Sequence, residues 1–499
     1  MILLISLNQQ DVEILKKAPT DISAFGVRHI SSYLKSKGEE CKIIFLAKKH
    51  NELETGKELR ELENFVKEIK PDIIGVSLMS NHNLRAVKIT KDLKRYYSRP
   101  VVWGGIHPTI KPEECLDNAD LVFIGEAEHS FFEFYQEYKN GVQNYKTKGI
   151  VYKKEGKVLN NGVYPLCEDL DSLPFCDYDL NDHYVFSRGK LVQMDLKLLR
   201  DFLPFSQAQY RIMTTRGCPF NCAYCGSAFL KGMYEGKFLR TRSVDNVLEE
   251  IKQAKKQFSY LRLIKIMDDC FTINSVEWLA DFAEKYKKYI NLPFFCLVSP
   301  STITEEKLKI LMEAGLTSVQ AGLQSGSDRT NKDIYSRYIS QEQFLKAISI
   351  LNAFKDRLSF SFDVISDNPY EKEKDYVETA RLLNQIPRPF NLTLYSLTFY
   401  PGTELYRRAQ KEGIIGKDSQ EYITKQFHLL RNNYFNKLFR MIPVLSPSRA
   451  NIFIEMRHQP IQKIRLNLYY FVYAHRNIMP DFIKSFLKKI KNYDKQRRD

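Results

Sequence analysis

Three cysteines lie close together near the middle of the chain, in the stretch Met213-Thr-Thr-Arg-Gly-Cys-Pro-Phe-Asn-Cys-Ala-Tyr-Cys-Gly226. They are Cys218, Cys222 and Cys225, at the spacing C-x3-C-x2-C on a loop that follows a short strand-like run. Thiolates at this spacing can bind three corners of a cubane iron–sulfur cluster, which ordinarily takes four cysteine thiolates. One iron is then left without a protein ligand, and that open iron is the chemically interesting position.

Two other interpretations of the cysteines are weaker. A zinc site usually combines a tight cysteine pair with a second, distant pair of Cys or His, and this chain has no second tight pair. Three incidental cysteines seldom fall within eight residues. The stretch resembles the cluster-binding loop of radical S-adenosylmethionine (SAM) enzymes, which usually have an aromatic residue, here Tyr224, before the third cysteine. The resemblance implies a [4Fe–4S] cluster that binds SAM at its open iron and cleaves it to a 5′-deoxyadenosyl radical.

The elements around this loop form a repeating strand and helix pattern. Six strand-like runs begin near Arg211, Leu261, Pro293, Thr317, Leu358 and Asn391, and helical patterns follow them. Six such units favour a partial (β/α)6 barrel of the TIM type, with its chemistry at the carboxyl ends of the strands. At those ends the family resemblance implies SAM contacts by Tyr224, Asp268, Asp269, Gln324, Ser325 and Asp367.

Two of these positions depart from the family pattern. Asp268 and Asp269 stand where many members have Gly-Gly-Glu, and Gln324 replaces the usual glutamate of a G-I-E-S-G-S segment. Gln324 keeps the hydrogen-bonding capacity without the charge. For the two aspartates, a pair of solvated carboxylates or a helix cap before Asn274 is the alternative.

Residues 1 to about 140 alternate near-continuous apolar strands with helices, which indicates a parallel sheet covered on both faces. Such sheets bind ligands at the carboxyl ends of their strands. A G-x-G-x-x-G fingerprint is absent, so a nicotinamide or flavin site is not favoured. The strand-end loops resemble the cobalamin-binding domain that precedes the radical SAM domain in one large class of these enzymes. The implied cobalamin contacts are Ser77, Ser80, Gly104, Gly105, His107, Thr109, Gly125 and Glu126.

The axial ligand of cobalt is left open by the sequence. The D-x-H-x-x-G motif, whose histidine binds cobalt in many other cobalamin proteins, is absent. His107 follows Gly104-Gly105, where a histidine is more typical of a turn or a phosphate contact than of a metal ligand.

The resemblance covers residues 1 to about 415 and, together with the changed composition after Gly416, predicts an α/β protein of four segments. These are a Rossmann-like cobalamin-binding domain (1–145), a hairpin and interdomain linker (146–205), a partial radical SAM barrel (206–415) and a basic helical C-terminal region (416–499). With 43% hydrophobic and 27% charged residues, the chain has the composition of a soluble globular protein of several domains.

Cysteine usage and the N-terminus bear on the compartment. The nine cysteines are an odd and dispersed set, and the first apolar run is too short for a signal sequence. No run of about 18 apolar residues predicts a membrane span. We therefore expect a cytoplasmic protein, with peripheral membrane contact as a further expectation.

The net charge of +15 is concentrated at the C-terminus, where residues 431–499 hold 15 Lys and Arg against 4 Asp and Glu. Two segments, 461–473 and 482–491, mix apolar and basic residues, and in the second the apolar residues recur with a helical period. Such a helix can lie on an anionic membrane surface or cover an active site, and packing on the barrel is the alternative. No nucleic-acid module is recognisable, so a nucleic-acid partner is not expected.

The resemblance implies a cobalamin-dependent radical SAM enzyme, most often a methyltransferase acting on an unactivated carbon. It also implies a small-molecule substrate, for which the basic tail suggests an anionic or lipid-like compound, and an electron donor of the flavodoxin or ferredoxin type. A radical cyclase, oxidase or rearrangement enzyme with the same cofactors stays open, as does a non-catalytic corrinoid- or cluster-binding protein. A methylthiotransferase needs three further cysteines in its N-terminal domain, and Cys41 and Cys115 fall short of that.

Overall fold

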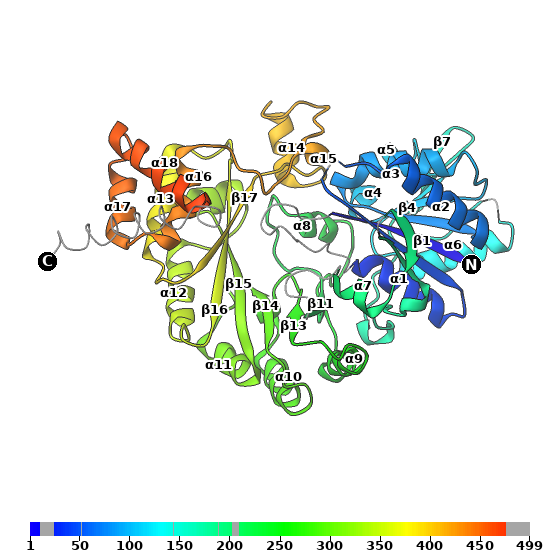
Figure 1. Ribbon diagram of the computed structural model, residues 1–499, viewed down its shortest axis with the longest axis horizontal. Helices are drawn as coiled ribbons and strands as arrows, with labels where there is room; N and C mark the ends of the chain where they lie inside the picture. Colours follow the sequence, from blue (N-terminus) through cyan, green and yellow to red (C-terminus); the bar gives the residue numbers. More distant parts are fainter. Residues whose placement is uncertain (10–23, 51, 143, 188, 202–208, 476–499) are drawn as a thin grey trace.

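The computed structural model describes residues 1–499 except 10–23, 51, 143, 188, 202–208 and 476–499 (Figure 1). Two sheets lie side by side, and the basic C-terminal helices lie at the end of the molecule farthest from the N-terminal sheet. The first sheet has nine strands in the order β7-β6-β5-β4-β3-β1-β2-β8-β9. Their bounds are β1 Ile2–Gln9, β2 Cys41–Lys48, β3 Ile73–Ser77, β4 Val101–Gly104, β5 Leu121–Phe123, β6 Ile150–Lys154, β7 Lys157–Asn160, β8 His183–Ser187 and β9 Lys190–Gln193.

Helices cover both faces of this sheet, as its apolar strands require. On one face, Leu4 and Phe45 pack with α1 (Phe25–Ser36) and α6 (Glu128–Lys139). On the other, Leu3 and Ile44 pack with α2 (Gly56–Ile69) and α3 (Asn83–Leu93). Both faces of the central strands are therefore buried, which explains why they read as continuous apolar runs.

The order of the central strands places a ligand site. β1 pairs in parallel with β2 on one side and with β3 on the other. The chain passes from β1 to β2 on one side of β1, and then crosses to β3 on the other side. Because the strand order reverses between β1 and β3, a crevice for a ligand opens at the carboxyl ends of these two strands. Two short helices, α4 (Ile106–Ile110) and α5 (Pro112–Cys115), follow β4 at this edge.

The sheet continues beyond residue 145, into the segment expected to be a hairpin and linker. β6 and β7 form the predicted hairpin, and β6 pairs antiparallel with β5. A second hairpin, β8–β9, was not predicted, and its first strand pairs in parallel with β2. The linker segment therefore completes both edges of the N-terminal sheet.

The second sheet has six strands in sequential order, and every neighbouring pair is parallel. All six predicted runs form its strands: β10 Gln209–Ile212, β13 Leu263–Ile266, β14 Phe294–Val298, β15 Leu316–Gln324, β16 Ser359–Ser366 and β17 Asn391–Ser396. The helices between and after them are α9 Val244–Gln257, α10 Val276–Tyr289, α11 Glu305–Ala314, α12 Gln341–Asn352, α13 Glu373–Gln385 and α14 Glu404–Lys411. Ser243, Ser275 and Thr304 cap α9, α10 and α11 by accepting a hydrogen bond from a first-turn N–H. This is the partial barrel that the sequence predicts.

The described part of the C-terminal region is mostly helical from residue 434 onward, with one short helix before it. It contains α15 Glu421–Thr424, α16 Tyr434–Met441, α17 Pro447–Glu455 and α18 Pro460–His475. Helices α16 and α17 pack against α13 of the barrel, and α18 packs against α16. The predicted stripe at 482–491 lies outside the described residues. Within the described residues, no helix has the length and apolar character needed to cross a bilayer.

Candidate active site between the two sheets

The three cysteines lie on the loop between β11 (Thr215–Arg216) and α8 (Gly226–Lys231). Backbone hydrogen bonds fix this loop from two sides: the Ala223 N–H donates to the Tyr335 carbonyl at 2.8 Å, and the Leu405 N–H donates to the Ala223 carbonyl at 2.9 Å. Gly217 begins the loop with φ +92°, and a Cβ there would lie 2.4 Å from the Phe238 carbonyl oxygen. Only glycine fits that turn, so the loop path is set immediately before the first cysteine.

The cysteines form no disulfide, and Cys222 and Cys225 lie near enough to raise the pKa of another thiol of the set. Burial raises the pKa of the Cys218 thiol to about 12, and Cys225 and Cys222 add to that rise. In the part of the chain that the structure describes, no three His, Cys, Asp or Glu side chains are placed to share one metal ion. A cubane does not need that arrangement, because each thiolate binds a different iron. Three neighbouring thiols that iron can deprotonate fit such a cluster.

Asp268 supports the strand that leads into this loop. Its carboxylate accepts hydrogen bonds from the N–H groups of Thr214 at 2.6 Å and Thr215 at 3.1 Å, and from the Thr214 hydroxyl. Burial raises its pKa to about 6. Asp268 does not line the main cavity, whereas Asp269 does and accepts a hydrogen bond from Ser227 Oγ at 3.1 Å. The predicted pair therefore splits, with Asp268 turned toward the loop and Asp269 toward the cavity.

The other predicted SAM residues lie at the ends of β15 and β16 or on the cluster loop, and none lines the cavity. Tyr224 packs edge-on against Tyr335, with ring centroids 5.0 Å apart. Ser325 donates to Glu371 at 2.7 Å, and Asp367 accepts from the Arg431 N–H at 2.9 Å. Gln324 and Asp367 have φ values of +66° and +55°, which side chains rarely adopt. Strained backbone at two strand ends is typical of a functional edge.

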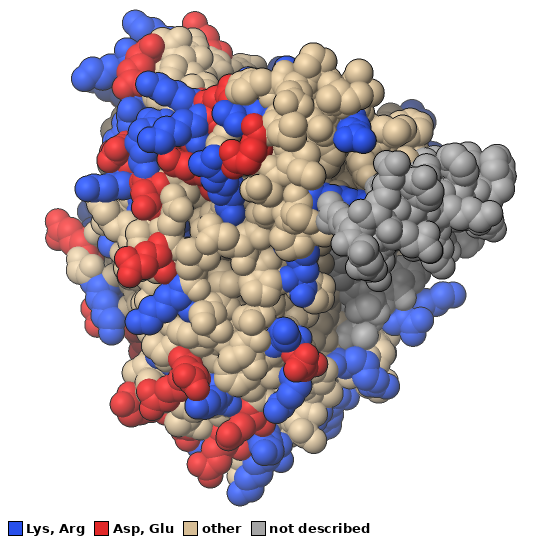
Figure 2. All heavy atoms as spheres, turned by 90° about the vertical axis from the view of Figure 1, so that its left-hand side faces the viewer, with Lys and Arg blue, Asp and Glu red and all other residues tan. Residues whose placement is uncertain are grey.

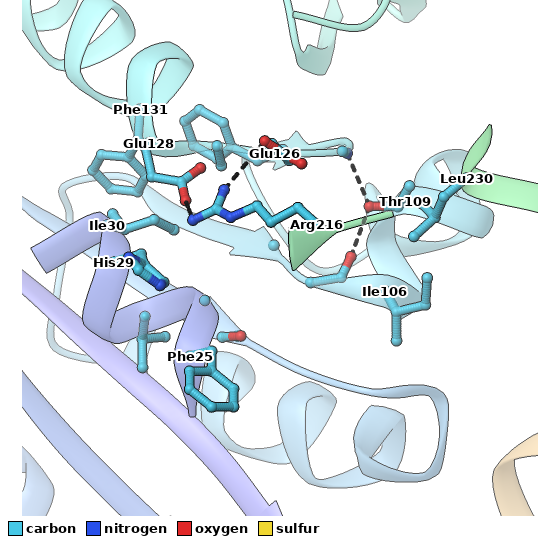
Figure 3. A pocket seen from close by; sticks show the side chains of 18 of the residues that line it. Phe25, His29, Ile30, Ile106, Thr109, Glu126, Glu128, Phe131, Arg216 and Leu230 are labelled. Carbon is cyan, nitrogen blue, oxygen red and sulfur yellow. Dashed lines mark hydrogen bonds and ion pairs between the residues drawn. The ribbon is translucent and has the colours of Figure 1, made fainter. Parts of the chain in front are cut away.

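A cavity of about 390 Å³ lies between the N-terminal sheet and the cluster loop (Figure 3). Six of the eight predicted cobalamin residues line it: Ser77, Gly104, Gly105, Thr109, Gly125 and Glu126. Phe25, Phe123, Phe131 and Trp103 make its walls largely apolar. A cavity of this size takes a drug-sized ligand or the part of a larger cofactor that enters between the sheets.

Two glycines of the cavity wall fit tightly against neighbouring residues. Gly105 has φ +103°, and a Cβ there would lie 2.6 Å from the carbonyl oxygen of Leu78. A Cβ on Gly75 would lie 2.8 Å from a methyl group of Leu4. Both glycines line the cavity, so part of its wall is bare backbone held in close packing. A largely apolar cavity with such a wall fits the flat, bulky face of a corrinoid.

Ser80 and His107 are the two predicted cobalamin residues that do not line the cavity. The His107 ring is buried, with Nδ1 3.2 Å from Ser80 Oγ and its centroid 6.1 Å from that of Tyr422. Burial, with the nearby Lys111, lowers the pKa of His107 to about 4. It is thus a neutral histidine packed under α15, on the far side of α4 from the cavity-lining Ile106 and Thr109.

A buried ionic cluster joins the two halves of the cavity and was not predicted. Arg216 forms ion pairs with Glu126 at 3.2 Å and Glu128 at 2.8 Å, and Figure 3 shows it between the two carboxylates. Arg240 also pairs with Glu126, and it donates to both oxygens of that carboxylate. Tyr234 Oη accepts a hydrogen bond from the Glu126 N–H at 3.0 Å. The corrinoid-side loop after β5 is therefore tied to the cluster loop two residues before Cys218.

His29 of α1 was also missed, because residues 22–37 show only a helical period. It lines the cavity, and its Nε2 lies 3.3 Å from Cys176 Sγ in the linker segment. Burial, followed by the charge of Arg216, lowers its pKa to about 4. His29 therefore faces the cavity as a neutral imidazole, a group that can donate or accept a hydrogen bond.

Asp363 is an ionisable residue inside the barrel, and it is paired with Gln320. Phe362 packs against Phe344 of α12, so Asp363 points to the opposite, inner face of the sheet. Gln320 Nε2 donates to both of its carboxylate oxygens, at 2.9 and 2.8 Å. Burial raises the pKa of Asp363 to about 6.

The raised pKa of Asp363 predicts that the unfolding free energy of the enzyme depends on pH. The folded value of about 6 exceeds the ordinary 3.8, so the contribution of Asp363 to stability is complete below about pH 3.8 and is lost as pH rises through 6. The loss reaches about 3 kcal/mol at neutral pH. We expect Asp363→Asn to flatten the fall in unfolding free energy between pH 5 and pH 7, measured anaerobically in urea. The exposed Asp356→Asn is the matched control, and an equal slope in both variants would contradict the assignment.

Comparison with known proteins gives a match for the N-terminal domain and another for the barrel. The description "B12 binding domain" matches residues 13–134 and "Radical SAM superfamily" matches residues 212–383. An "uncharacterized methyltransferase" of Pyrococcus horikoshii is 28% identical over 354 residues, covering 70% of this chain and 72% of that one. Cytidylyl-2-hydroxyethylphosphonate methyltransferase of Streptomyces wedmorensis is 24% identical over 357 residues, 64% of each chain.

A solved structure shares the fold. The radical SAM methyltransferase TsrM from Kitasatospora setae, solved with cobalamin and a [4Fe–4S] cluster, superposes with a TM-score of 0.64 at 15% identity, covering 82% of this chain and 75% of that one. At that identity the likeness concerns the fold alone. The matched domains are the two that enclose the cavity, and the chain belongs to the cobalamin-dependent radical SAM enzymes, whose cofactors are a [4Fe–4S] cluster, SAM and cobalamin.

Proposed function

We propose that this enzyme transfers a methyl group to an unactivated carbon of a small-molecule substrate. The observation that carries the proposal is the shared wall of the cavity. Arg216 and Leu230 line it from the cluster side, and Gly105 and Thr109 line it from the corrinoid side. A corrinoid held by one half would therefore face SAM held by the other. The relatives named as methyltransferases support the same reaction.

The cysteines and the aspartates have separate proposed roles. Cys218, Cys222 and Cys225 hold the cluster. Asp269 contacts SAM from the cavity, whereas Asp268 acts through Thr214 and Thr215 and is a positioning residue. When bound, the cluster supplies the electron that cleaves SAM, and the corrinoid supplies the methyl group.

The remaining contacts to SAM and the corrinoid are proposed from the positions of the residues in the structure. Tyr224, Gln324, Ser325 and Asp367 lie at the loop and strand ends where the adenosyl and methionyl parts of SAM would extend. The corrinoid contacts are Ser77, Gly104, Gly105, Thr109, Gly125 and Glu126. The apolar walls exclude water from both cofactors, which protects reactive species from side reactions. Ser80 and His107 pack on the side of α4 that faces away from the cavity and help to hold this helix in position.

The test uses anaerobically reconstituted protein with a corrinoid, a low-potential reductant and SAM carrying a deuterated methyl group. We expect 5′-deoxyadenosine, together with deuterium transferred to the corrinoid. Formation of 5′-deoxyadenosine without any transfer of label would instead favour a radical cyclase, oxidase or rearrangement enzyme. Corrinoid and cluster binding with neither product would indicate a non-catalytic protein.

Gly105→Ala gives a structural test of the corrinoid site. The new methyl group would meet the Leu78 carbonyl, which belongs to the backbone and cannot move aside. We expect at least a ~10-fold weaker corrinoid affinity, measured by absorbance titration, because even ~1.4 kcal/mol of strain has that effect. Gly156→Ala is the control, because Gly156 also has positive φ but no atom within 4 Å of its Cβ position. Equal losses in both variants would assign the effect to backbone strain alone.

We also propose the chemical class of the substrate, a membrane contact and the type of electron donor. The net charge of +15 supports an anionic or lipid-like substrate and contact of the basic C-terminal region with a membrane surface. An electron donor of the flavodoxin or ferredoxin type would reduce the cluster.

A further inference from the structure

The exposed face of α18 carries an apolar stripe. Four large side chains at spacings of three, four and three residues are each more than half exposed: Ile461 at 54%, Ile464 at 62%, Leu468 at 61% and Phe471 at 55%. The opposite face holds the buried Gln462 and Leu466, which pack toward α16. Apolar side chains in such a row are uncommon on a soluble surface and usually mark a binding surface.

Other apolar side chains are exposed elsewhere in the C-terminal helical region. Ile452 and Met456, in and just after α17, and Val444 are exposed on the same C-terminal helical region. Figure 2 looks onto this end of the molecule and shows an area without charged side chains, bordered by Lys, Arg, Asp and Glu. Exposed apolar side chains in this region are therefore not confined to α18.

The charge around the stripe indicates the kind of partner. No Asp or Glu occurs from Met456 to Pro480. Lys463 and Arg465 lie exposed on α18, and within the described residues no ion pair of either is recorded. The sequence that follows, 476–499, adds eight Lys and Arg against three Asp.

We propose that α18 is a membrane-surface helix, with its apolar stripe in the outer part of an anionic bilayer and its cations at the headgroups. This rests on the peripheral contact put forward under the proposed function and names the surface that makes it. Non-directional apolar contact beside exposed cations suits a lipid surface. The enzyme would then meet a membrane-dissolved substrate.

The test is vesicle co-sedimentation of the full chain carrying its cluster. We expect binding to phosphatidylcholine vesicles that contain about 30% phosphatidylglycerol and much weaker binding to phosphatidylcholine alone. Ile464→Ser with Leu468→Ser should lower the partition coefficient about 10- to 100-fold. The control is Val158→Ser with Leu159→Ser, two exposed aliphatic residues on β7 of the other domain, which should bind as the parent does.

A second variant separates charge from apolar contact. Lys463→Gln with Arg465→Gln keeps the stripe and should remove much of the preference for phosphatidylglycerol. Formation of 5′-deoxyadenosine, measured without vesicles on each preparation, should stay unchanged, so a failure of the proposed chemistry is seen separately from a failure of membrane binding.

Three results would overturn the proposal. One is equal binding of the stripe variant and the control. Another is loss of binding on deleting residues 476–499 while the stripe variant still binds, which would assign the contact to the tail. The third is a parent dimer that becomes a monomer in the stripe variant, seen by sedimentation velocity without any vesicle binding, which would make a second copy the partner.

Discussion

Cys222→Ser should abolish formation of 5′-deoxyadenosine, with a fall of about 10³-fold or more when the reaction is followed anaerobically by chromatography. A serine alcohol binds iron much more weakly than a thiolate because it is far harder to deprotonate, so one of the three protein ligands of the cluster should be lost or weakened. The loop itself should keep its path, because the Ala223 backbone stays bonded to Tyr335 and Leu405.

The control for this experiment is Cys167→Ser. Cys167 is a partly exposed cysteine of the linker segment that belongs to no cluster of thiols. It should retain the iron and sulfide content and the product yield of the parent enzyme. If Cys222→Ser keeps its iron and its product while remaining folded, the three-cysteine cluster is wrong.

Arg216→Met should destabilise the enzyme by about 3–5 kcal/mol, because it removes the ion-pair partner of the buried Glu128 and one of the two arginines that bind the partly buried Glu126. We expect the variant also to retain less corrinoid after desalting, since the pairs hold the loop after β5 against the cluster loop. Urea unfolding and absorbance measure the two effects. Arg381→Met provides the control, because Arg381 and Glu455 form an exposed pair whose loss should cost less than about 1 kcal/mol.

The ionisation of Glu128 allows the Arg216→Met prediction to be tested a second way, through the pH dependence of stability. Burial alone would raise the pKa of Glu128, but the charge of Arg216 holds it well below its usual range. In the parent, this group therefore stabilises the fold above its ordinary pKa and loses that contribution as pH falls. In Arg216→Met the Glu128 carboxylate stays buried but no longer has the charge of Arg216 beside it. The loss of unfolding free energy relative to the parent should therefore become smaller as pH falls. Adding Glu128→Gln should recover part of the lost stability, and no recovery would assign the effect to packing.

Local sequence patterns predict the barrel strands and the cluster loop well. The six runs are apolar and separated by capped helices, so propensity, period and tertiary structure agree. The C-x3-C-x2-C spacing is likewise local. The β8–β9 hairpin was missed because Lys190 and Gln193 are exposed, so its strands resemble a polar linker until β2 supplies a partner.

The residues around the cavity depend on contacts between distant segments. Asp268 and Asp269 are adjacent in sequence, and only the pairing of β10 with β13 brings Asp268 under Thr214. Arg216 and Glu128 belong to different domains, so their ion pair has no local signature. His107 follows the glycines that line the cavity, yet the turn of α4 carries its side chain to the other side. A helical register, unlike a strand register, moves a side chain by about 100° per residue.

The two hairpins at the edges of the N-terminal sheet determine how the corrinoid-binding half can exist alone. A fragment ending at residue 145 would lack β6 beside β5 and β8 beside β2, leaving two strands with unpaired backbone groups. Bare edges of this kind promote pairing between molecules. A fragment ending after Gln193 keeps both edges paired within one chain, so the smallest self-contained corrinoid module reaches well into the sequence that connects it to the barrel.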